Sequence, residues 1–203
     1  MKEKTKTCLA LGDSYTAGTG ITTQESLPFQ LAAALHSSGI PLSCPHVVAR
    51  NGWTTNELLE GLAAEKLQAP YDLVTLLIGV NNQYQGWSVE EYKLQFASLL
   101  AQAICLAGGS AAHVIVFSIP DWSVTPFAAQ REPERIAAEI NAYNAANQAE
   151  TQRTHAHYVD ITPISRLAAH NPALLANDQL HPSGVMIANW VGLALPIAES
   201  ILN

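Results

Sequence analysis

The sequence predicts an α/β fold in which helices cover both faces of a five-stranded parallel sheet, a three-layer α/β/α sandwich. Short apolar, β-branched runs alternate with longer segments of helical periodicity, as in parallel strands joined by helices. These runs are apolar at nearly every position, which is typical of strands buried on both faces. At 203 residues and 48% hydrophobic, the chain is long enough for one domain over residues 1–203 and short for two.

Five runs are predicted as strands and five segments as helices. The strands are expected at residues 7–11, 46–49, 73–78, 114–119 and 157–161. The helices are expected at residues 28–36, 54–65, 88–107, 134–153 and 183–202. Residues 121–133 contain two prolines and are expected to form a long loop after the fourth strand.

Capping signals mark the ends of two of these helices. Ser88 and Glu91 have the spacing of a capping box at the start of one helix, and the glycines at 108–109 end it. Thr54 and Glu57 repeat the capping-box spacing at the start of another.

The charge of the chain disfavours two classes of partner. The formal net charge is −7, the isoelectric point is near 5.4, and no run of Lys or Arg is longer than two. Nucleic acids and anionic membrane surfaces are therefore not expected as partners, and a small or lipid-like neutral substrate fits better. The sequence does not indicate an oligomeric state.

No export signal or membrane span is expected. The lysine-containing start, residues 1–6, precedes an apolar stretch of only about five residues, fewer than the roughly seven to fifteen of a signal peptide. The apolar segment 185–201 is interrupted by Asn189, Pro196 and Glu199, which favours a buried amphipathic helix bent at Pro196. Three cysteines in unrelated contexts are expected to be free thiols and to indicate a cytoplasmic location: Cys8, Cys44 and Cys105.

Polar residues and glycines directly follow three of the predicted strands. Asp13 and Ser14 come after the first strand, Asn51 and Gly52 after the second, and residues 79–81 after the third. In parallel sheets, ligands bind beyond the carboxyl ends of the strands. The sequence therefore predicts a site at this edge.

Ser14 has two interpretations. By itself, a Ser in a strand-to-helix turn commonly caps the helix. A nucleophilic Ser needs a base, and the base needs an acid that orients it. His181 has a carboxylate three residues away, at Asp178, in a turn that enters a helix at Pro182. This spacing lets Asp178 reach one imidazole nitrogen of His181 while the other faces Ser14.

Attack on a carbonyl also needs donors for the oxyanion that forms. Three candidates lie at the predicted sheet edge. They are the backbone N–H of Ser14, the backbone N–H of Gly52, which no side chain shields, and the side-chain amide of Asn81.

These residues resemble the SGNH hydrolases, the GDSL-type esterase and lipase family, whose four motif blocks occur in order over most of the chain. The blocks are Gly12-Asp13-Ser14, Gly52, Gly79-x-Asn81 and Asp178-x-x-His181. The resemblance implies a flavodoxin-like sheet, with Ser14, Asp178 and His181 as a catalytic triad. It also assigns Ser14, Gly52 and Asn81 to the oxyanion hole.

Two positions depart from the family pattern. Tyr15 stands where the family's name has leucine, and Asn82 follows the motif Asn where many members have Asp. Neither is a triad position, so they bear on pocket shape and local hydrogen bonding. Four aromatic residues flank the motifs and could either wall a substrate cleft or pack in the core or at its rim: Tyr15, Trp53, Tyr84 and Trp122.

Two further polar features each have a functional and a simpler interpretation. Asp13 could tune the site, but hydrogen bonding to the backbone of the bend is favoured. His155, His157 and Asp160 could be taken as metal ligands, but a clear third ligand set is lacking, and no metal is predicted.

The sequence thus predicts a serine esterase that hydrolyses carboxylic esters through an acyl-enzyme without a cofactor. One alternative is a flavodoxin-like FMN-binding module, because residues 14–19 form a hydroxyl-rich loop at the start of a helix. Another is an acyltransferase or thioesterase that uses the same triad. The natural substrate is left open among lipids, sugar acetates, thioesters and aryl esters.

Overall fold

The computed structural model describes residues 5–203, and residues 1–4 of the lysine-containing start lie outside the described residues. Five parallel strands form one sheet in the order β2-β1-β3-β4-β5. The strands are β1 (Cys8–Gly12), β2 (His46–Ala49), β3 (Leu73–Leu77), β4 (Val114–Phe117) and β5 (His157–Val159).

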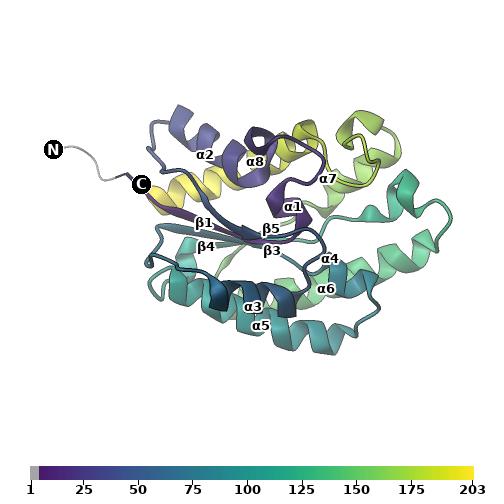
Figure 1. Ribbon diagram of the computed structural model, residues 1–203, viewed down its shortest axis with the longest axis horizontal. Helices are drawn as coiled ribbons and strands as arrows, with labels where there is room; N and C mark the ends of the chain where they lie inside the picture. The colour runs from purple at the N-terminus through teal and green to yellow at the C-terminus, as the bar shows by residue number, and fades with distance from the viewer. Residues whose placement is uncertain (1–4) are drawn as a thin grey trace.

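Helices cover both faces of this sheet. One face carries α2 (Leu27–Ser37) and α8 (Gly184–Leu202), and the other carries α3 (Thr55–Ala64), α5 (Val89–Leu106) and α6 (Pro133–Thr154) (Figure 1). Three short helices follow strands: α1 (Ser14–Ala17), α4 (Val80–Tyr84) and α7 (Thr162–Arg166). Single 3-10 turns occur at Thr23–Glu25, Ala111–His113, Trp122–Val124, Pro126–Ala128, Leu167–Ala169 and Pro172–Leu174.

The predicted fold class is confirmed. Each of the five long helices begins and ends within one residue of its predicted position, and each strand within two. The three short helices were not predicted, because four or five residues are too few for a helical period to show. The expected loop over 121–133 contains two of the 3-10 turns.

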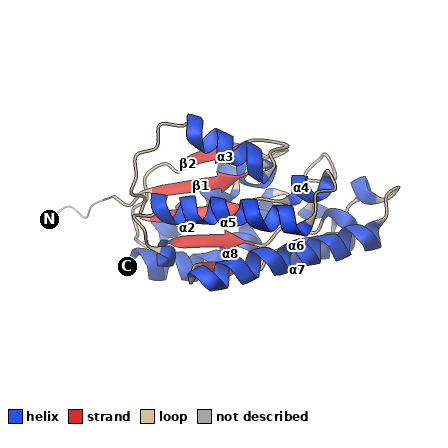
Figure 2. Cartoon of the chain, turned by 90° about the horizontal axis from the view of Figure 1, so that it is seen from below, coloured by secondary structure: helices blue, strands red, loops and turns tan. Residues whose placement is uncertain are grey.

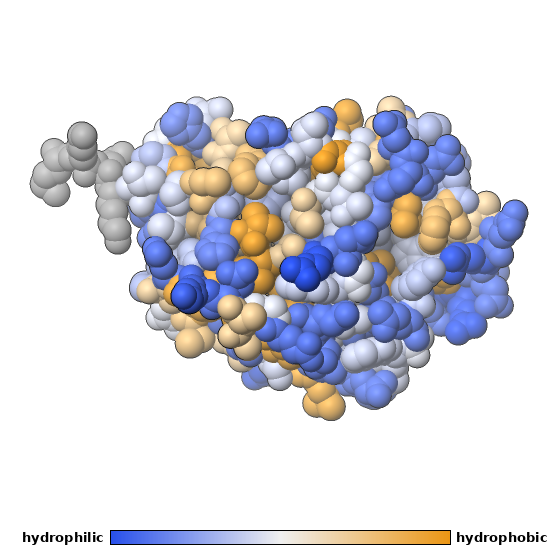
Figure 3. All heavy atoms as spheres, viewed as in Figure 1, coloured by the Kyte–Doolittle hydropathy of each residue, from blue (hydrophilic) through white to orange (hydrophobic). Residues whose placement is uncertain are grey.

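The burial of the strands explains their apolar runs. All residues of β1, β3 and β4 are buried, since these strands have a neighbour on each side and helices on both faces. The edge strands β2 and β5 are only partly buried. The face of the molecule in Figure 3 is mostly polar, with apolar side chains in small separate patches.

Helix α8 is, by length and composition alone, long and apolar enough to cross a membrane. In this structure it packs against α2 and continues through Pro196 to its end. The bend expected at Pro196 stays a prediction. The helix buries a stripe of side chains in the core: Met186, Ile187, Trp190, Val191, Ala194, Ala198 and Leu202.

The direction of the strands places the site. All of the strands point away from the end of the molecule that holds the C-terminus (Figure 2). The carboxyl ends of the strands therefore meet at the opposite end, where α1 follows β1 and α4 follows β3.

The capping box at the start of α5 provides a test of local stability. The hydroxyl of Ser88 accepts a hydrogen bond from the Glu91 N–H at 3.2 Å, and the Glu91 carboxylate accepts one from the Ser88 N–H at 3.0 Å. We expect Ser88→Ala to lower the free energy of unfolding in urea by about 1 kcal/mol. The matched control is Ser98→Ala inside the same helix, where Ala is the better helix former and no loss is expected. Equal stabilities for the two variants would contradict the capping role.

Candidate active site

Ser14 lies where β1 ends and α1 begins. Asp13 is the N-cap of this short helix, and its Oδ1 accepts a hydrogen bond from the Tyr15 N–H at 3.0 Å. Gly12 permits the close approach of α1 and β3 at this point, because a Cβ there would clash with the Thr16 hydroxyl and with the Leu77 carbonyl oxygen. The turn presents Ser14 at the sheet edge with only 4% of its surface exposed.

Asp178 and His181 lie together in the loop before α8. Nδ1 of His181 is 2.7 Å from Oδ2 of Asp178. Oδ1 of the same carboxylate accepts hydrogen bonds from the backbone N–H groups of Leu180, at 3.0 Å, and His181, at 2.9 Å. Gln179 has φ 59°, a left-handed conformation, and this turns the chain tightly enough for one carboxylate to hold both the loop and the ring.

The electrostatics of this pair favour an ionised Asp178. Burial by itself would raise the pKa of the carboxyl group. Hydrogen bonds from the His181 ring and from the backbone N–H groups of His181 and Leu180 outweigh that effect and hold the pKa below its usual range. Asp178 is thus an anion beside the imidazole across the neutral pH range.

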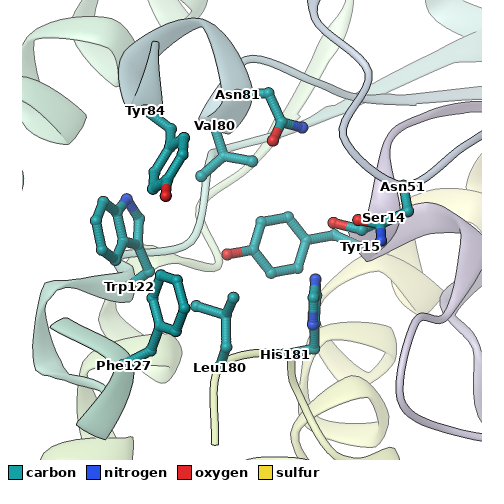
Figure 4. Close-up of a pocket in the computed structure, with 10 residues that line it drawn as sticks. All are labelled: Ser14, Tyr15, Asn51, Val80, Asn81, Tyr84, Trp122, Phe127, Leu180 and His181. Atoms are coloured by element: carbon teal, nitrogen blue, oxygen red, sulfur yellow. The ribbon is translucent and has the colours of Figure 1, made fainter. Parts of the chain in front are cut away.

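Ser14 and His181 line the same cleft, which has a volume of about 160 Å³. Figure 4 shows the imidazole of His181 directed toward Ser14, with the ring of Tyr15 extending from Ser14 toward the far end. The ten lining residues come from the ends of β1, β2 and β3, from the loop after β4 and from the loop before α8. They are Ser14, Tyr15, Asn51, Val80, Asn81, Tyr84, Trp122, Phe127, Leu180 and His181.

The three oxyanion donors expected from the sequence are placed differently relative to this cleft. Ser14 and Asn81 line it. The Asn81 amide donates one N–H to the Trp53 carbonyl oxygen at 2.9 Å, so its second N–H is left for a ligand. Gly52 is not among the lining residues but directly follows Asn51, which is, and has φ 84° at the turn after β2.

Asn82, the second departure from the family pattern, ties two of these loops together. It is fully buried, donates to the Thr55 hydroxyl at 2.7 Å and accepts from the Thr55 N–H at 3.0 Å. Thr55 is the first residue of α3, three positions after Gly52. The bond pair therefore fixes the turn that carries Gly52 relative to the helix that carries Asn81.

The aromatic residues expected at the cleft divide into two groups. Tyr15, Tyr84 and Trp122 line it. Trp53 does not, because its ring packs against Gly61 of α3 and the guanidinium of Arg50 lies 5.3 Å from its centre. Trp53 thus packs at the rim and not along the cleft in this structure.

Four lining residues were given no role from the sequence, although Asn51 was expected at this edge of the sheet. Val80 and Leu180 lie inside the motifs Gly79-x-Asn81 and Asp178-x-x-His181, and Asn51 precedes Gly52, so their positions could have indicated them. Phe127 lies in the loop over 121–133, where no periodic pattern was available. Its ring is 6.0 Å from that of Trp122 and is 42% exposed.

The histidine pair weighed as a metal site is placed elsewhere. His155 ends α6 in a left-handed conformation, and His157 on β5 bonds to the Ala112 carbonyl oxygen through Nε2. Among residues 5–203, no group of three or more His, Cys, Asp or Glu side chains is arranged to hold a metal ion.

Asp13, the residue before the candidate nucleophile, is a buried carboxyl group. Burial raises its pKa to about 7, although hydrogen bonds from backbone N–H groups, that of Tyr15 foremost, oppose the rise. Within the described part of the chain, its Oδ2 has no hydrogen-bond partner. Of the two roles considered for Asp13, hydrogen bonding to the bend is the one for which the structure provides a partner.

Residues 10–185 of the chain match the family described as GDSL-like Lipase/Acylhydrolase. Among solved structures, that of TesA aligns with a TM-score of 0.76 at 19% sequence identity, over 97% of this chain and 100% of that one. A lipase/acylhydrolase from Enterococcus faecalis aligns with a TM-score of 0.75 at 21% identity, over 98% and 97%. Axe2, an acetylxylan esterase from Geobacillus stearothermophilus, aligns with a TM-score of 0.67 at 17% identity, over 100% and 97%. No curated protein matches the chain in sequence.

The raised pKa of Asp13 predicts how stability depends on pH. Because the folded protein holds this proton to about pH 7 and the unfolded chain releases it near pH 4, ionisation of Asp13 lowers stability as pH rises through this window. The stability of Asp13→Asn minus that of the wild type should therefore rise by roughly 2 to 3 kcal/mol between pH 5 and pH 8. Urea unfolding of both proteins at the two pH values measures the difference. A difference that does not change with pH would contradict the buried charge.

Proposed function

Because the chain belongs to the GDSL-like lipase/acylhydrolase family and is a carboxylic ester hydrolase, we propose that it works through an acyl-enzyme with Ser14 as nucleophile. His181 is the general base and Asp178 orients it. The observation that carries the proposal is the 2.7 Å contact between Asp178 and His181, whose ring is directed toward Ser14 in the same cleft. The flavin-binding alternative has no role for this pair.

In the first half of the reaction, Oγ of Ser14 attacks the ester carbonyl carbon and its proton passes to Nε2 of His181. The imidazolium that forms is stabilised by the Asp178 carboxylate at Nδ1. The tetrahedral intermediate then collapses. The bond to the alcohol breaks, and His181 returns the proton to the leaving oxygen.

The negative charge on the tetrahedral oxygen is held by three donors: the N–H groups of Ser14 and Gly52 and the amide of Asn81. Such donors lower the barrier because they are already oriented when the charge develops. The bond that Asn81 donates to the Trp53 carbonyl oxygen supports this role, as do the two bonds between Asn82 and Thr55. These bonds restrict the donor groups before substrate binds.

In the second half, a water molecule takes the place of the alcohol. His181 removes its proton, the hydroxide attacks the acyl carbonyl, and Ser14 leaves with the proton. The products are a carboxylic acid and an alcohol, and the cycle needs no cofactor.

The far end of the cleft supports a small substrate with an apolar group. Val80, Tyr84, Trp122, Phe127 and Leu180 line it, opposite the polar end at Ser14 and His181 (Figure 4). Rings and aliphatic side chains of this kind bind apolar substrate parts by removing both surfaces from water. We also propose a cytoplasmic location, on the three free thiols alone.

The nucleophile is tested by Ser14→Ala. This variant should lower kcat/KM for p-nitrophenyl acetate by at least roughly 10³-fold, because the acyl-enzyme cannot form. An alkyl p-nitrophenyl phosphonate should label the wild type on the tryptic peptide that contains Ser14, as detected by mass spectrometry. Ser98→Ala, which lies on the exposed side of α5, should retain both activity and labelling. Labelling of a different serine would reject the assignment.

The orienting role of Asp178 is tested by Asp178→Asn. The Asn oxygen can still accept the two backbone N–H bonds, but the amide nitrogen cannot accept from the Nδ1–H of His181, so the wrong tautomer is favoured. We expect kcat to fall roughly 10²- to 10⁴-fold with little change in the urea midpoint. The matched control is Asp160→Asn after β5, where the carboxylate bonds Ser118 and Thr162 away from the cleft. Equal activity of the two variants would be inconsistent with the proposed role.

A further inference from the structure

Tyr15 separates the cleft from a second, smaller cavity. The cleft has a volume of about 160 Å³, and the cavity behind the ring has about 10 Å³, which is room for one water molecule at most. Three residues line both spaces and thus form the wall between them: Tyr15, Trp122 and Leu180. Among them, Tyr15 is the residue next to Ser14 in the chain.

The ring of Tyr15 is a fixed part of this wall. Its side chain is 4% exposed and packs edge-on against His181, with ring centres 5.8 Å apart, and against Trp190 at 6.3 Å. Its backbone N–H is held by the Asp13 carboxylate. Burial, with the nearby carboxylates of Asp13, Asp121 and Asp178, keeps the pKa of the phenol above its usual range, so the ring stays neutral.

The space behind the ring is mostly apolar. Its apolar lining includes Leu175, Pro182, Met186 and Trp190, and the last two are buried residues of α8. Three polar residues also line it: Asp121, Thr125 and Ser165. A chain of methylene groups that entered this region would be removed from water. With the Tyr15 ring in place there is no room for one, because the cavity is too small and the ring closes it on the side of the cleft.

The position of Ser14 determines which part of a substrate contacts the Tyr15 ring. An acyl group bound to Oγ of Ser14 starts beside the Tyr15 ring, which points along the cleft toward Trp122 (Figure 4). Beyond a short acyl group, further methylenes that follow the cleft reach Tyr84 and Phe127, which are 49% and 42% exposed. Methylenes that stay in contact with water add little binding energy. The volume of the cleft is also smaller than that of most ligand pockets, which is roughly 300–1,000 Å³.

We propose that Tyr15 sets the acyl-chain limit of the enzyme and makes it an esterase of short-chain carboxylic esters. The ring blocks the buried route toward Met186 and Trp190, and its removal joins the two cavities into one channel. This inference rests on the proposed function, because it assumes that the acyl group is bound to Ser14. It assigns Tyr15 a role in specificity and not in the chemical steps.

The test compares kcat/KM for p-nitrophenyl butanoate and octanoate in a series of variants. In the wild type the ratio of octanoate to butanoate should be one or lower. Tyr15→Ala should raise that ratio at least tenfold, because each methylene that becomes buried contributes about fourfold. Tyr15→Leu, which removes less of the ring, should give an intermediate ratio. The ratio is the readout because loss of the contact with His181 would affect both esters equally.

Two matched controls separate the effect of the Tyr15 ring from the effects of its hydroxyl and of the cavity volume behind it. Tyr15→Phe keeps the ring and loses only the hydroxyl, so it should keep the wild-type ratio. Met186→Ala enlarges the space behind the ring but leaves the ring in place, so it should also keep that ratio. If Tyr15→Ala loses turnover or does not fold, Tyr15→Leu and the dissociation constants of butanoate and octanoate, measured by calorimetry, report the same preference.

The outcomes distinguish the two proposals. A wild-type ratio in both Tyr15→Ala and Tyr15→Leu, or a raised ratio in Met186→Ala alone, would overturn the role of Tyr15 and leave the acyl-enzyme mechanism intact. Ester hydrolysis that survives Ser14→Ala would instead reject the mechanism. A wild type that already prefers octanoate tenfold would also overturn the proposed limit.

Discussion

The common direction of the five strands is the constraint on which the site depends. Helices cover both faces of the sheet, so side chains in the middle of the strands are buried among apolar neighbours and cannot reach substrate. Polar side chains that can contact a substrate therefore lie in the loops where the strands end. Since all strands end on the same side, Ser14, Asn51 and Asn81 meet although they are far apart in the chain.

The loop before α8 meets the same edge by a different route. Asp178 uses one oxygen to hold two backbone N–H groups and the other to hold the imidazole of His181. A single carboxylate thus holds both the loop and the imidazole ring. The lowered pKa of Asp178 follows from the same hydrogen bonds. This loop leads directly into α8, which packs against α2.

The buried carboxyl group of Asp13, next to Ser14 in the chain, lowers the stability of the fold when it is ionised. Asp13 caps the turn at Ser14, but one of its oxygens has no hydrogen-bond partner within residues 5–203, and burial raises its pKa. A neutral side chain would remove that penalty. The turn therefore combines a useful hydrogen bond to Tyr15 with an unfavourable charge, and its net effect depends on pH.

The sequence by itself determined the order of elements, the capped ends of the helices and the motif residues, because these depend on neighbours within a few positions. Ser88 with Glu91 and Asp178 with His181 are of this kind, and their bonds are present as their spacing predicts. Only the tertiary structure decided which aromatic residues face the cleft. Trp53 turns to α3, Phe127 joins Trp122, and Tyr15 stands between two cavities, because such positions depend on packing between segments that are distant in the chain.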